Sequence, residues 1–485
     1  MTGEPRMLID GKLVGASNGA TFDNVNPATE AVIGQAADAT IDDARAAVAA
    51  ARRAFDETEW ATDHAFRARC LRQLRDAMVE TRQEFVDTIV AEAGSPVSLM
   101  PIIQFDPPVA WLEHWATMAE TYPYEKPLPT TKMFGSEHRG VERREPMGVV
   151  TAITPFNYPI FVNLAKVGPG LAAGNSVILK PSPDTPWSAT LMGRVVAERT
   201  DIPAGVFNVV TSSSPEVSES LVTDPRVDMI TFTGSTATGR RIMHGCADTV
   251  KKCFLELGGK SANIVLDDAN LDIALALAAG WVCTHSGQGC AAYTRLLLPR
   301  SRYEDAVEIV KGHFERARVG DPTDPTILHG PQINARQREK VLGLIDAGKS
   351  EGARLLVGGG RPDDLPVGYY VQPTLFADVK PDMTIAQEEF FGPVLVVIPY
   401  DDEDDAVEIA NNSIYGLSGS VWSADEDRAL GVARRMRTGT VSINGSQWLD
   451  ATRAFGGYKQ SGVGRENGIE GYEEYLETKV VALPG

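Results

Sequence analysis

The chain has 485 residues, with 46 Lys plus Arg against 65 Asp plus Glu and a formal net charge of −19 at pH 7. This length predicts two or three domains with substantial cores, which excludes a peptide or a lone binding module. A surface this negative repels phosphate backbones and anionic lipid, so we expect no nucleic-acid or membrane partner.

The N-terminal residues and the cysteines bear on the cellular compartment. The start, Met1 to Arg6, shows no apolar segment behind a basic one, so we expect no secretory signal and a cytoplasmic protein. The five cysteines are Cys70, Cys246, Cys253, Cys283 and Cys290. They are dispersed and form no C-x-x-C pair, which speaks against a disulfide framework or a metal site.

The first part of the chain is predicted to be helical and to end in an arm. A capping-box pattern, Thr40-x-x-Asp43, precedes an alanine-rich helix, and helical patterns run from about Ala65 to Ala93. Residues 126–144 are polar and contain proline, with Gly140 between two alternating stretches. This pattern predicts a hairpin or a protruding arm.

From Gly148 onward, short β-rich runs alternate with segments of helix length. The runs span 149–154, 176–180, 206–210 and 228–232. Such alternation predicts βαβ units and a parallel sheet. A second α/β stretch begins near residue 262, so we place a domain boundary close to Gly258–Gly259. The tail, 475–483, is predicted to be a strand without an obvious hairpin mate, which favours pairing with another chain.

A glycine-containing turn is a candidate phosphate site. Gly234-Ser-Thr-Ala-Thr-Gly239 follows a predicted strand and opens a helical segment, and a helix N-terminus with small residues suits a phosphate. Arg240 and Arg241 stand where a P-loop would need Lys and Ser or Thr, which disfavours nucleoside triphosphate hydrolysis. A plain strand-to-helix turn is the alternative.

Two polar residues stand at predicted strand ends. Lys180 could bind ribose or phosphate oxygens at the carboxyl edge of the sheet, or could be a solvated lysine. Asn157, between Pro155 and Pro159, could donate to a developing oxyanion or could cap the next helix.

Cys290 is the candidate nucleophile. It lies in Ser286-Gly-Gln-Gly-Cys, where small neighbours leave its sulfur accessible, whereas the other four cysteines lie in apolar stretches typical of core thiols. Glu256 is inside an apolar run, where burial would make it a general base; a ribose ligand and a solvent-facing glutamate are the alternatives. His285 is the one histidine near Cys290 and could form a Cys–His pair.

Together these motifs resemble the aldehyde dehydrogenase superfamily. The resemblance extends from Asn26-Pro-Ala-Thr29 to Gly457-Tyr-Lys-Gln-Ser-Gly462. It rests on Asn157 in Pro-Phe-Asn-Tyr-Pro, Lys180 in Leu-Lys-Pro-Ser, Gly234-Ser235, Glu256 in Glu-Leu-Gly-Gly-Lys, Cys290 in Gly-Gln-Gly-Cys, and Glu389 with Phe391 in Glu-Glu-Phe-Phe-Gly-Pro.

The resemblance implies an α/β fold of three parts. These are a Rossmann-like dinucleotide-binding domain (1–123 and 147–257), an α/β catalytic domain (258–459), and a small β bridging or oligomerisation arm with a tail (124–146 and 470–485). Because the arm exchanges contacts between subunits in this family, we expect a homodimer or a homotetramer.

The resemblance also implies a non-acylating, hydrolytic mechanism. Cys290 would attack the aldehyde carbon, and the Asn157 amide and the Cys290 backbone N–H would hold the oxyanion. After hydride transfer to the nicotinamide, Glu256 would activate the water that hydrolyses the thioester to a carboxylic acid. The presence of Glu256 argues against transfer of the acyl group to coenzyme A. No metal is implied.

The cofactor is expected to be NAD or NADP. The implied cofactor-binding residues are Ile153, Thr154, Phe156, Lys180, Ser182, Pro183, Gly234, Ser235, Leu257, Gly258, Glu389 and Phe391. Lys180 and Glu389 would hold ribose hydroxyls, Phe391 would pack near the nicotinamide, and Ser235 would meet the pyrophosphate. Many NAD-preferring members carry a glutamate at the place of Pro183. Because this chain has no carboxylate there, we favour NAD over NADP only slightly.

The small residues beside Cys290, Gly289 and Ala291, predict a roomy substrate tunnel. The candidate apolar walls are Phe156, Tyr158, Trp448 and Phe455. We expect an aromatic or aliphatic aldehyde, and the alternative is an acidic semialdehyde bound by Arg453. A cofactor-independent thiol esterase that uses the same Cys290 and Glu256 is a further alternative.

Overall fold

The computed structural model describes residues 3–484, and its largest sheet has eight strands in the order β19-β11-β10-β7-β8-β9-β1-β2. The parallel strands are β7 (Val149–Ile153), β8 (Ser176–Lys180), β9 (Phe207–Val209), β10 (Met229–Thr233) and β11 (Lys252–Glu256). Antiparallel edges are formed by β1 (Met7–Ile9), β2 (Lys12–Val14) and β19 (Gly462–Val463). The predicted βαβ alternation is confirmed here.

Helices cover both faces of this sheet. Those that alternate with its strands are α6 (Pro159–Ala172), α7 (Pro186–Arg199), α8 (Pro215–Thr223) and α9 (Thr236–Ala247). The helices that precede its parallel strands in the sequence are α1 (Ile41–Glu57), α2 (His64–Glu80), α3 (Arg82–Ala93), η3 (Met100–Gln104), α4 (Asp106–Ala110) and α5 (Leu112–Thr121). The predicted capping box opens α1, since Asp43 N donates to Thr40 Oγ1 and Thr40 N donates to Asp43 Oδ2.

A second sheet of seven strands follows, in the order β14-β15-β16-β13-β12-β17-β18. Its strands are β12 (Ala262–Val265), β13 (Arg295–Pro299), β14 (Arg354–Val357), β15 (Thr374–Ala377), β16 (Val394–Tyr400), β17 (Ser418–Trp422) and β18 (Thr440–Ile443). The helices around it are α10 (Leu271–Cys283), α11 (Tyr303–Arg316), α12 (Ala335–Ser350), α13 (Thr384–Gln387), α14 (Glu403–Asn411) and α15 (Glu426–Ala433). The chain passes between the two sheets across Gly258–Gly259, where we proposed a domain boundary.

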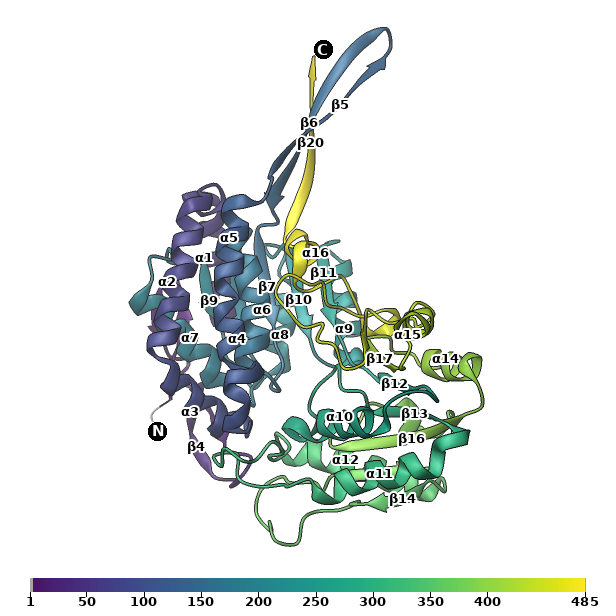
Figure 1. Ribbon diagram of the computed structural model, residues 1–485. Coiled ribbons are helices and arrows are strands. Elements are labelled where there is room, and N and C mark those ends of the chain that lie inside the picture. Colours follow the sequence, from purple (N-terminus) through teal and green to yellow (C-terminus); the bar gives the residue numbers. More distant parts are fainter. Residues whose placement is uncertain (1–2, 485) are drawn as a thin grey trace.

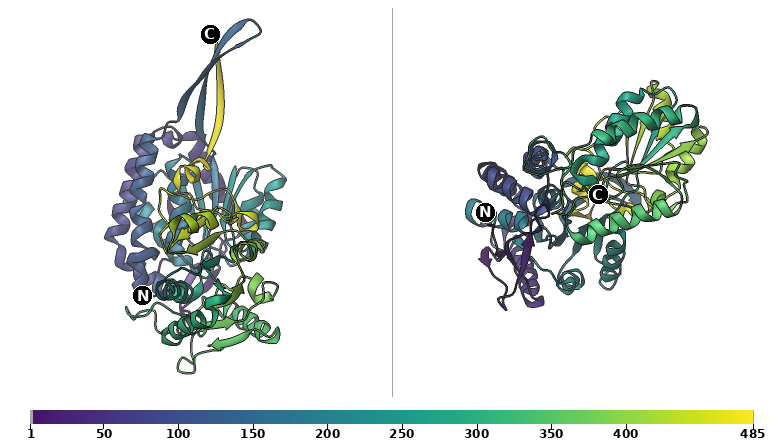
Figure 2. Two further views of the ribbon diagram at one scale, coloured as in Figure 1. Left: turned by 45° about the vertical axis from the view of Figure 1, so that its right-hand side comes forward. Right: turned by 90° about the horizontal axis from the view of Figure 1, so that it is seen from below.

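A three-stranded arm extends away from both sheets (Figures 1 and 2). It consists of β5 (Glu125–Met133), β6 (Ser136–Pro146) and β20 (Leu476–Pro484), with β6 in the middle. The hairpin was predicted correctly, but its turn is at Phe134–Gly135, and Gly140 lies inside β6. The expectation that the tail lacks a mate in its own chain was wrong, because β20 pairs with β6 along its whole length.

Two smaller features complete the fold. A separate hairpin is formed by β3 (Thr21–Val25) and β4 (Val32–Ala37), and α16 (Gly468–Glu473) immediately precedes the arm strand β20. Within residues 3–484, no helix combines the length and the apolar character needed to cross a bilayer.

Candidate active site

Four parallel strands of the first sheet end side by side at one edge. Ile153 at the end of β7 is paired with Lys180 at the end of β8, and Thr233 at the end of β10 is paired with Glu256 at the end of β11. Open α/β sheets bind ligands at this carboxyl edge. The strand order therefore brings together candidates that lie up to about a hundred positions apart in the sequence.

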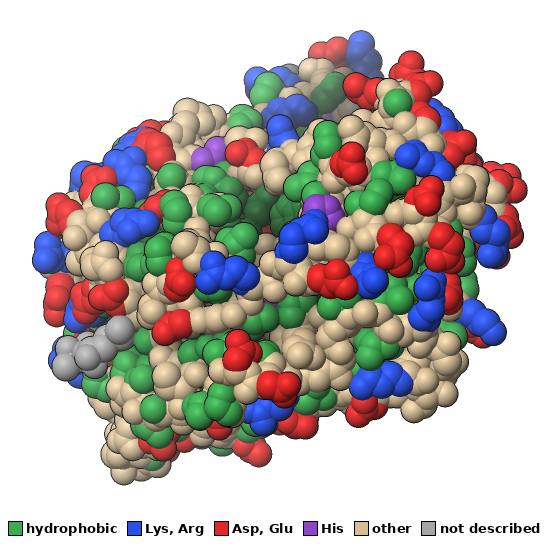
Figure 3. Space-filling view, turned by 60° about the horizontal axis from the view of Figure 1, so that its bottom comes forward, with side chains coloured by type: hydrophobic (Ala, Val, Ile, Leu, Met, Phe, Trp, Pro, Cys, Tyr) green, Lys and Arg blue, Asp and Glu red, His purple; other side chains and the backbone are tan. Residues whose placement is uncertain are grey.

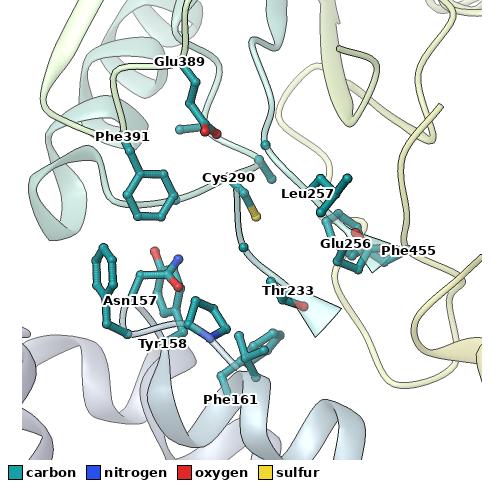
Figure 4. Close-up of a pocket in the computed structure, with 18 of the residues that line it drawn as sticks. Asn157, Tyr158, Phe161, Thr233, Glu256, Leu257, Cys290, Glu389, Phe391 and Phe455 are labelled. Atoms are coloured by element: carbon teal, nitrogen blue, oxygen red, sulfur yellow. The ribbon is translucent and has the colours of Figure 1, made fainter. Parts of the chain in front are cut away.

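A cavity of about 240 Å³ adjoins this edge and reaches helices and loops around the second sheet. Thirteen of the predicted site residues line it: Phe156, Asn157, Tyr158, Gly234, Ser235, Glu256, Leu257, Gly258, Cys290, Glu389, Phe391, Trp448 and Phe455. Figure 4 shows several of them, with the Cys290 sulfur between Asn157 on one side and Glu256 on the other. The cavity therefore brings the candidate nucleophile, oxyanion donor and base together.

Cys290 follows η4 (Thr284–Gly287) and points its sulfur into the cavity. Burial raises the pKa of its thiol, and the nearby carboxylates of Glu389, Glu256 and Glu466 raise it further. These surroundings favour the thiol over the thiolate at Cys290. The other four cysteines do not line this cavity, so Cys290 is the one thiol placed for nucleophilic attack.

Asn157 lies just beyond β7 and is buried. Its side-chain Nδ2 donates to the backbone carbonyl of Gln288 (2.7 Å), which leaves the second N–H of the amide for a ligand. The alternative that Asn157 caps the next helix is wrong: Tyr158 is the N-cap residue of α6, and the Asn157 amide bonds to Gln288 instead. This geometry suits an oxyanion donor.

Glu256 is the last residue of β11 and is 2% exposed, so the solvent-facing alternative is wrong. Neither carboxylate oxygen has a hydrogen-bond partner among the described residues. Burial raises the pKa of Glu256 well above its usual range; Glu466 raises it further, and Lys166 opposes the shift. A carboxylate with a raised pKa and free oxygens suits a general base.

The buried ion pair beside Glu256 was missed from the sequence. Lys166 Nζ in α6 lies 3.0 Å from Glu466 Oε1, with the two side chains 0% and 5% exposed. Lys166 Nζ also stands 4.8 Å from the ring centre of Phe254. The sequence could have indicated such a pair, because Lys166 is a charged residue within the otherwise apolar segment 159–172 and a buried lysine rarely lacks a partner. No sequence pattern around Glu466 indicates that it pairs with Lys166.

The predicted cofactor residues beside the nucleophile, which are Phe156, Gly258, Glu389 and Phe391, form a narrow cradle. Glu389 Oε1 accepts a hydrogen bond from Gly259 N (2.9 Å), and burial raises the pKa of Glu389. A Cβ on Gly258 would lie 2.7 Å from a Glu389 carboxylate oxygen, so glycine keeps this space open. Phe391 packs edge-on against Phe156, with ring centres 5.7 Å apart.

The remaining cofactor candidates follow the same sheet edge. Ser235 caps α9 by accepting from Thr238 N (3.2 Å), and Thr233 Oγ1 is buried without a hydrogen-bond partner among the described residues. Lys180 is 6% exposed, and burial lowers its pKa to about 8, while Asp184 and Asp38 oppose that shift. An orphaned hydroxyl, a helix N-terminus and a buried cation at one edge fit a dinucleotide.

Five predicted cofactor residues lie outside the cavity lining. They are Ile153, Thr154, Lys180, Ser182 and Pro183. Thr154 Oγ1 donates to Asn163 Oδ1 (2.7 Å), and Ser182 Oγ donates to Asp184 Oδ2 (3.3 Å). These hydroxyls are therefore already engaged, although their backbone remains near the ends of β7 and β8.

The substrate side of the cavity has apolar walls. Trp448 and Phe455 stack with ring centres 5.1 Å apart, and Trp448 Nε1 donates to Tyr293 Oη (3.0 Å). Arg453 is exposed and does not line the cavity. Further apolar lining residues that the sequence reading missed are Ile103, Phe161, Trp281 and Leu449. Figure 3 shows hydrophobic side chains gathered around a hollow in the face that it views.

Comparisons with known proteins match the chain over almost its full length. A model described as "Aldehyde dehydrogenase family" matches residues 14–481. A 3-succinoylsemialdehyde-pyridine dehydrogenase from a Pseudomonas species is 43% identical over 478 residues, covering 98% of this chain and 97% of that protein.

Solved structures are similar over the same extent. A Mycobacterium tuberculosis aldehyde dehydrogenase complexed with NAD+ is 41% identical, with a TM-score of 0.95 over 100% of this chain and 99% of that one. An aldehyde dehydrogenase C mutant from Pseudomonas syringae, complexed with NAD+ and octanal, is 38% identical, with a TM-score of 0.93 over 99% and 96%. These matches confirm the predicted fold class.

Proposed function

The chain belongs to the aldehyde dehydrogenase family, and from this premise we propose that it oxidises an apolar aldehyde to a carboxylic acid with NAD+ as hydride acceptor. The observation that carries the proposal is the placement of Cys290 between Asn157 and Glu256 in one cavity. A nucleophile, an oxyanion donor and a base are the three groups that oxidation through a thioester requires.

The proposed reaction begins at Cys290. Its thiol loses its proton to solvent water as the sulfur bonds to the aldehyde carbon, and the oxyanion so formed accepts hydrogen bonds from Asn157 Nδ2 and the Cys290 backbone N–H. The thiohemiacetal carbon then loses hydride, which bound NAD+ would accept, and a thioester is left. Glu256 takes a proton from water as the water oxygen attacks the thioester; the carbon–sulfur bond breaks, the acid leaves, and the Cys290 thiolate takes the proton back from Glu256.

We propose that the cradle described above holds the dinucleotide. Bound NAD+ supplies the hydride acceptor. Lys180 and Glu389 would hold ribose hydroxyls, Ser235 would meet the pyrophosphate, and Phe391 would pack near the nicotinamide. Pro183 carries no carboxylate, but Asp184 and Asp38 both act electrostatically on Lys180. A 2′-phosphate near Lys180 would meet these two negative charges, so NAD+ is favoured over NADP+.

The substrate class follows from the cavity walls. Aromatic and aliphatic side chains dominate the substrate side, and the one cation among the described lining residues is Lys340, which acts on Glu389. The related Pseudomonas syringae structure contains octanal, an apolar aldehyde. Against the apolar walls, an acidic semialdehyde would lose hydration without gaining a cation, because Lys340 already acts on Glu389; we therefore propose an uncharged, apolar substrate.

The test is the rate of reduced-nicotinamide absorbance with a panel of aldehydes. We expect kcat/KM for octanal and benzaldehyde to exceed that for succinic semialdehyde by about 100-fold, since an unpaired buried charge costs several kcal/mol. Running the panel with NAD+ and with NADP+ tests the cofactor. A preference for succinic semialdehyde would contradict the apolar substrate, and ester hydrolysis indifferent to either cofactor would favour the thiol esterase.

The pH dependence of turnover tests the electrostatic environment of Glu256. Because Glu466 raises the pKa of Glu256, Glu466→Gln should lower that pKa and move the acid limb of the kcat profile to lower pH by about one pH unit. Lys166→Met removes a charge that lowers this pKa, so the limb should move to higher pH. Steady-state kcat across the acid and neutral range measures both shifts. If the two substitutions move the acid limb in the same direction, the assignment of this limb to Glu256 is contradicted.

We propose a homo-oligomer that assembles through the arm. The tip of the arm exposes Phe134 by 97% and Met133 by 57%, and β20 exposes Val480 by 61%. Apolar side chains on an extended three-stranded sheet are costly in water, and a subunit of the same kind offers a matching surface. Sedimentation of the purified protein measures the assembly state.

A further inference from the structure

His285 is the histidine closest in sequence to Cys290, yet its ring contacts a different residue. His285 Nε2 lies 2.6 Å from the backbone carbonyl oxygen of Asn157, and His285 is 1% exposed. A carbonyl oxygen can only accept, so Nε2 is the protonated nitrogen of the ring. The other nitrogen, Nδ1, has no hydrogen-bond partner among the described residues. The ring is therefore not arranged as the base of a Cys–His pair.

The carbonyl of Asn157 is held from two sides. Gln104 Nε2, at the end of η3, donates to the same oxygen at 3.1 Å. The side chain of Asn157 in turn donates to the carbonyl of Gln288, which lies between His285 and Cys290 in the sequence. Asn157 is thus fixed by its backbone to His285 and by its amide to the segment that carries the nucleophile.

His285 is itself held in an unusual backbone conformation. His285 and Ser286 have φ angles of 49° and 56°, in the left-handed region that non-glycine residues rarely adopt. Residues 328–332 hold this turn: His285 N donates to Leu328 O (2.7 Å), and Gln332 Nε2 donates to Ser286 O (2.9 Å). A strained conformation that neighbouring hydrogen bonds maintain indicates a positional requirement.

We propose that His285 is a positioning residue that sets the orientation of Asn157 for the oxyanion. This inference rests on the oxyanion role of Asn157 under the proposed function. His285 does not line the cavity; it bonds to the backbone from which the Asn157 amide projects. A displacement of that amide by about 1 Å costs on the order of 100-fold in rate, because the oxyanion donor must match the transition state.

The test compares variants of His285 in the purified full-length enzyme with octanal and NAD+. His285→Leu and the shorter donor His285→Asn should lower kcat by about 10- to 100-fold, with KM for NAD+ changed by less than about twofold. His285→Gln, whose Nε2 can reach the same carbonyl, should recover most of kcat. If His285→Leu does not fold, the Asn and Gln variants still decide the matter.

His114 provides a control outside this turn. It lies in α5, is half-buried, and its Nε2 has no hydrogen-bond partner among the described residues. His114 does not line the cavity, so His114→Leu should keep kcat within about twofold. An equal loss of kcat in His285→Leu and His114→Leu would overturn the proposal.

A double-mutant cycle separates a positioning role from a general structural one. If His285 acts through Asn157, His285→Leu should cost nothing further in an Asn157→Ala background. A full loss in that background would overturn the inference. If Asn157→Ala alone leaves kcat unchanged, the oxyanion role in the proposed function fails instead, and an inactive wild type would refute the oxidation itself.

Discussion

Replacing Cys290 with alanine is expected to reduce aldehyde oxidation by at least about 10⁵-fold, a loss typical of removing a covalent nucleophile. No other described cysteine lines the cavity, so no second thiol can replace its sulfur. The variant should remain folded, because the change removes one atom beside the open cavity. The rate of reduced-nicotinamide formation with octanal measures the effect.

Cys283→Ala is the matched control for this prediction. Cys283 ends α10, only a few positions before Cys290, and is 8% exposed, but its sulfur is outside the cavity. It should keep most of the activity. Full turnover by Cys290→Ala would contradict the thiohemiacetal route, and the loss of activity in both variants would point to damage of the fold around residues 283–290.

Replacing Glu256 with glutamine is expected to lower kcat by about 10²- to 10⁴-fold, the usual contribution of a general base. The amide is nearly the same size, but it cannot take a proton from water. Hydride loss precedes this step in the proposed reaction, so the first hydride transfer should still occur at each active site. Rapid mixing should therefore show a burst of reduced nicotinamide close to one equivalent per active site, followed by slow turnover.

The burst distinguishes the role of Glu256 from that of Cys290. Cys290→Ala should show neither burst nor turnover, since no thioester can form. A Glu256→Gln variant without a burst would mean that Glu256 is needed before hydride loss, for example to take the thiol proton. A variant with normal kcat would remove Glu256 from the mechanism.

The local sequence predicted the strands and the motifs well because their signals are short-range. The runs that became β7, β8, β9 and β10 are largely apolar or β-branched and are bounded by glycine, proline or polar residues. Parallel strands place their carboxyl ends at one edge, so the strand order alone brings Lys180 near Thr233. The ends of these strands therefore indicated where the site lies.

Contacts between distant segments could not be predicted in the same way. Lys166 meets Glu466 across 300 positions, and Gln104 meets Asn157 across 53. His285 was noticed only as a neighbour of Cys290 in the sequence, whereas its hydrogen bond reaches back to Asn157. Each of these pairs depends on how separate elements pack, and no local pattern in one residue identifies the other.

The hairpin turn illustrates a different limit. Gly140 indicated a turn because glycine tolerates many backbone conformations, but the arm turns at Phe134–Gly135, where both residues have positive φ angles. Gly140 instead lies opposite Leu128 and Ala482 within the sheet. Composition can indicate that a polar segment forms a hairpin, but the register of the paired strands decides which glycine stands at the turn.

The last part of the chain completes three distant structures. Residues 462–463 add the edge strand to β11, Glu466 reaches the carboxylate environment of Glu256, and β20 closes the arm on β6. During synthesis the N-terminal segments leave the ribosome first. A nascent chain therefore carries its nucleophile and its first sheet long before the base has its final surroundings or the arm can present a complete surface. Maturation of the site and readiness for assembly consequently both wait until residues 462–484 have been made.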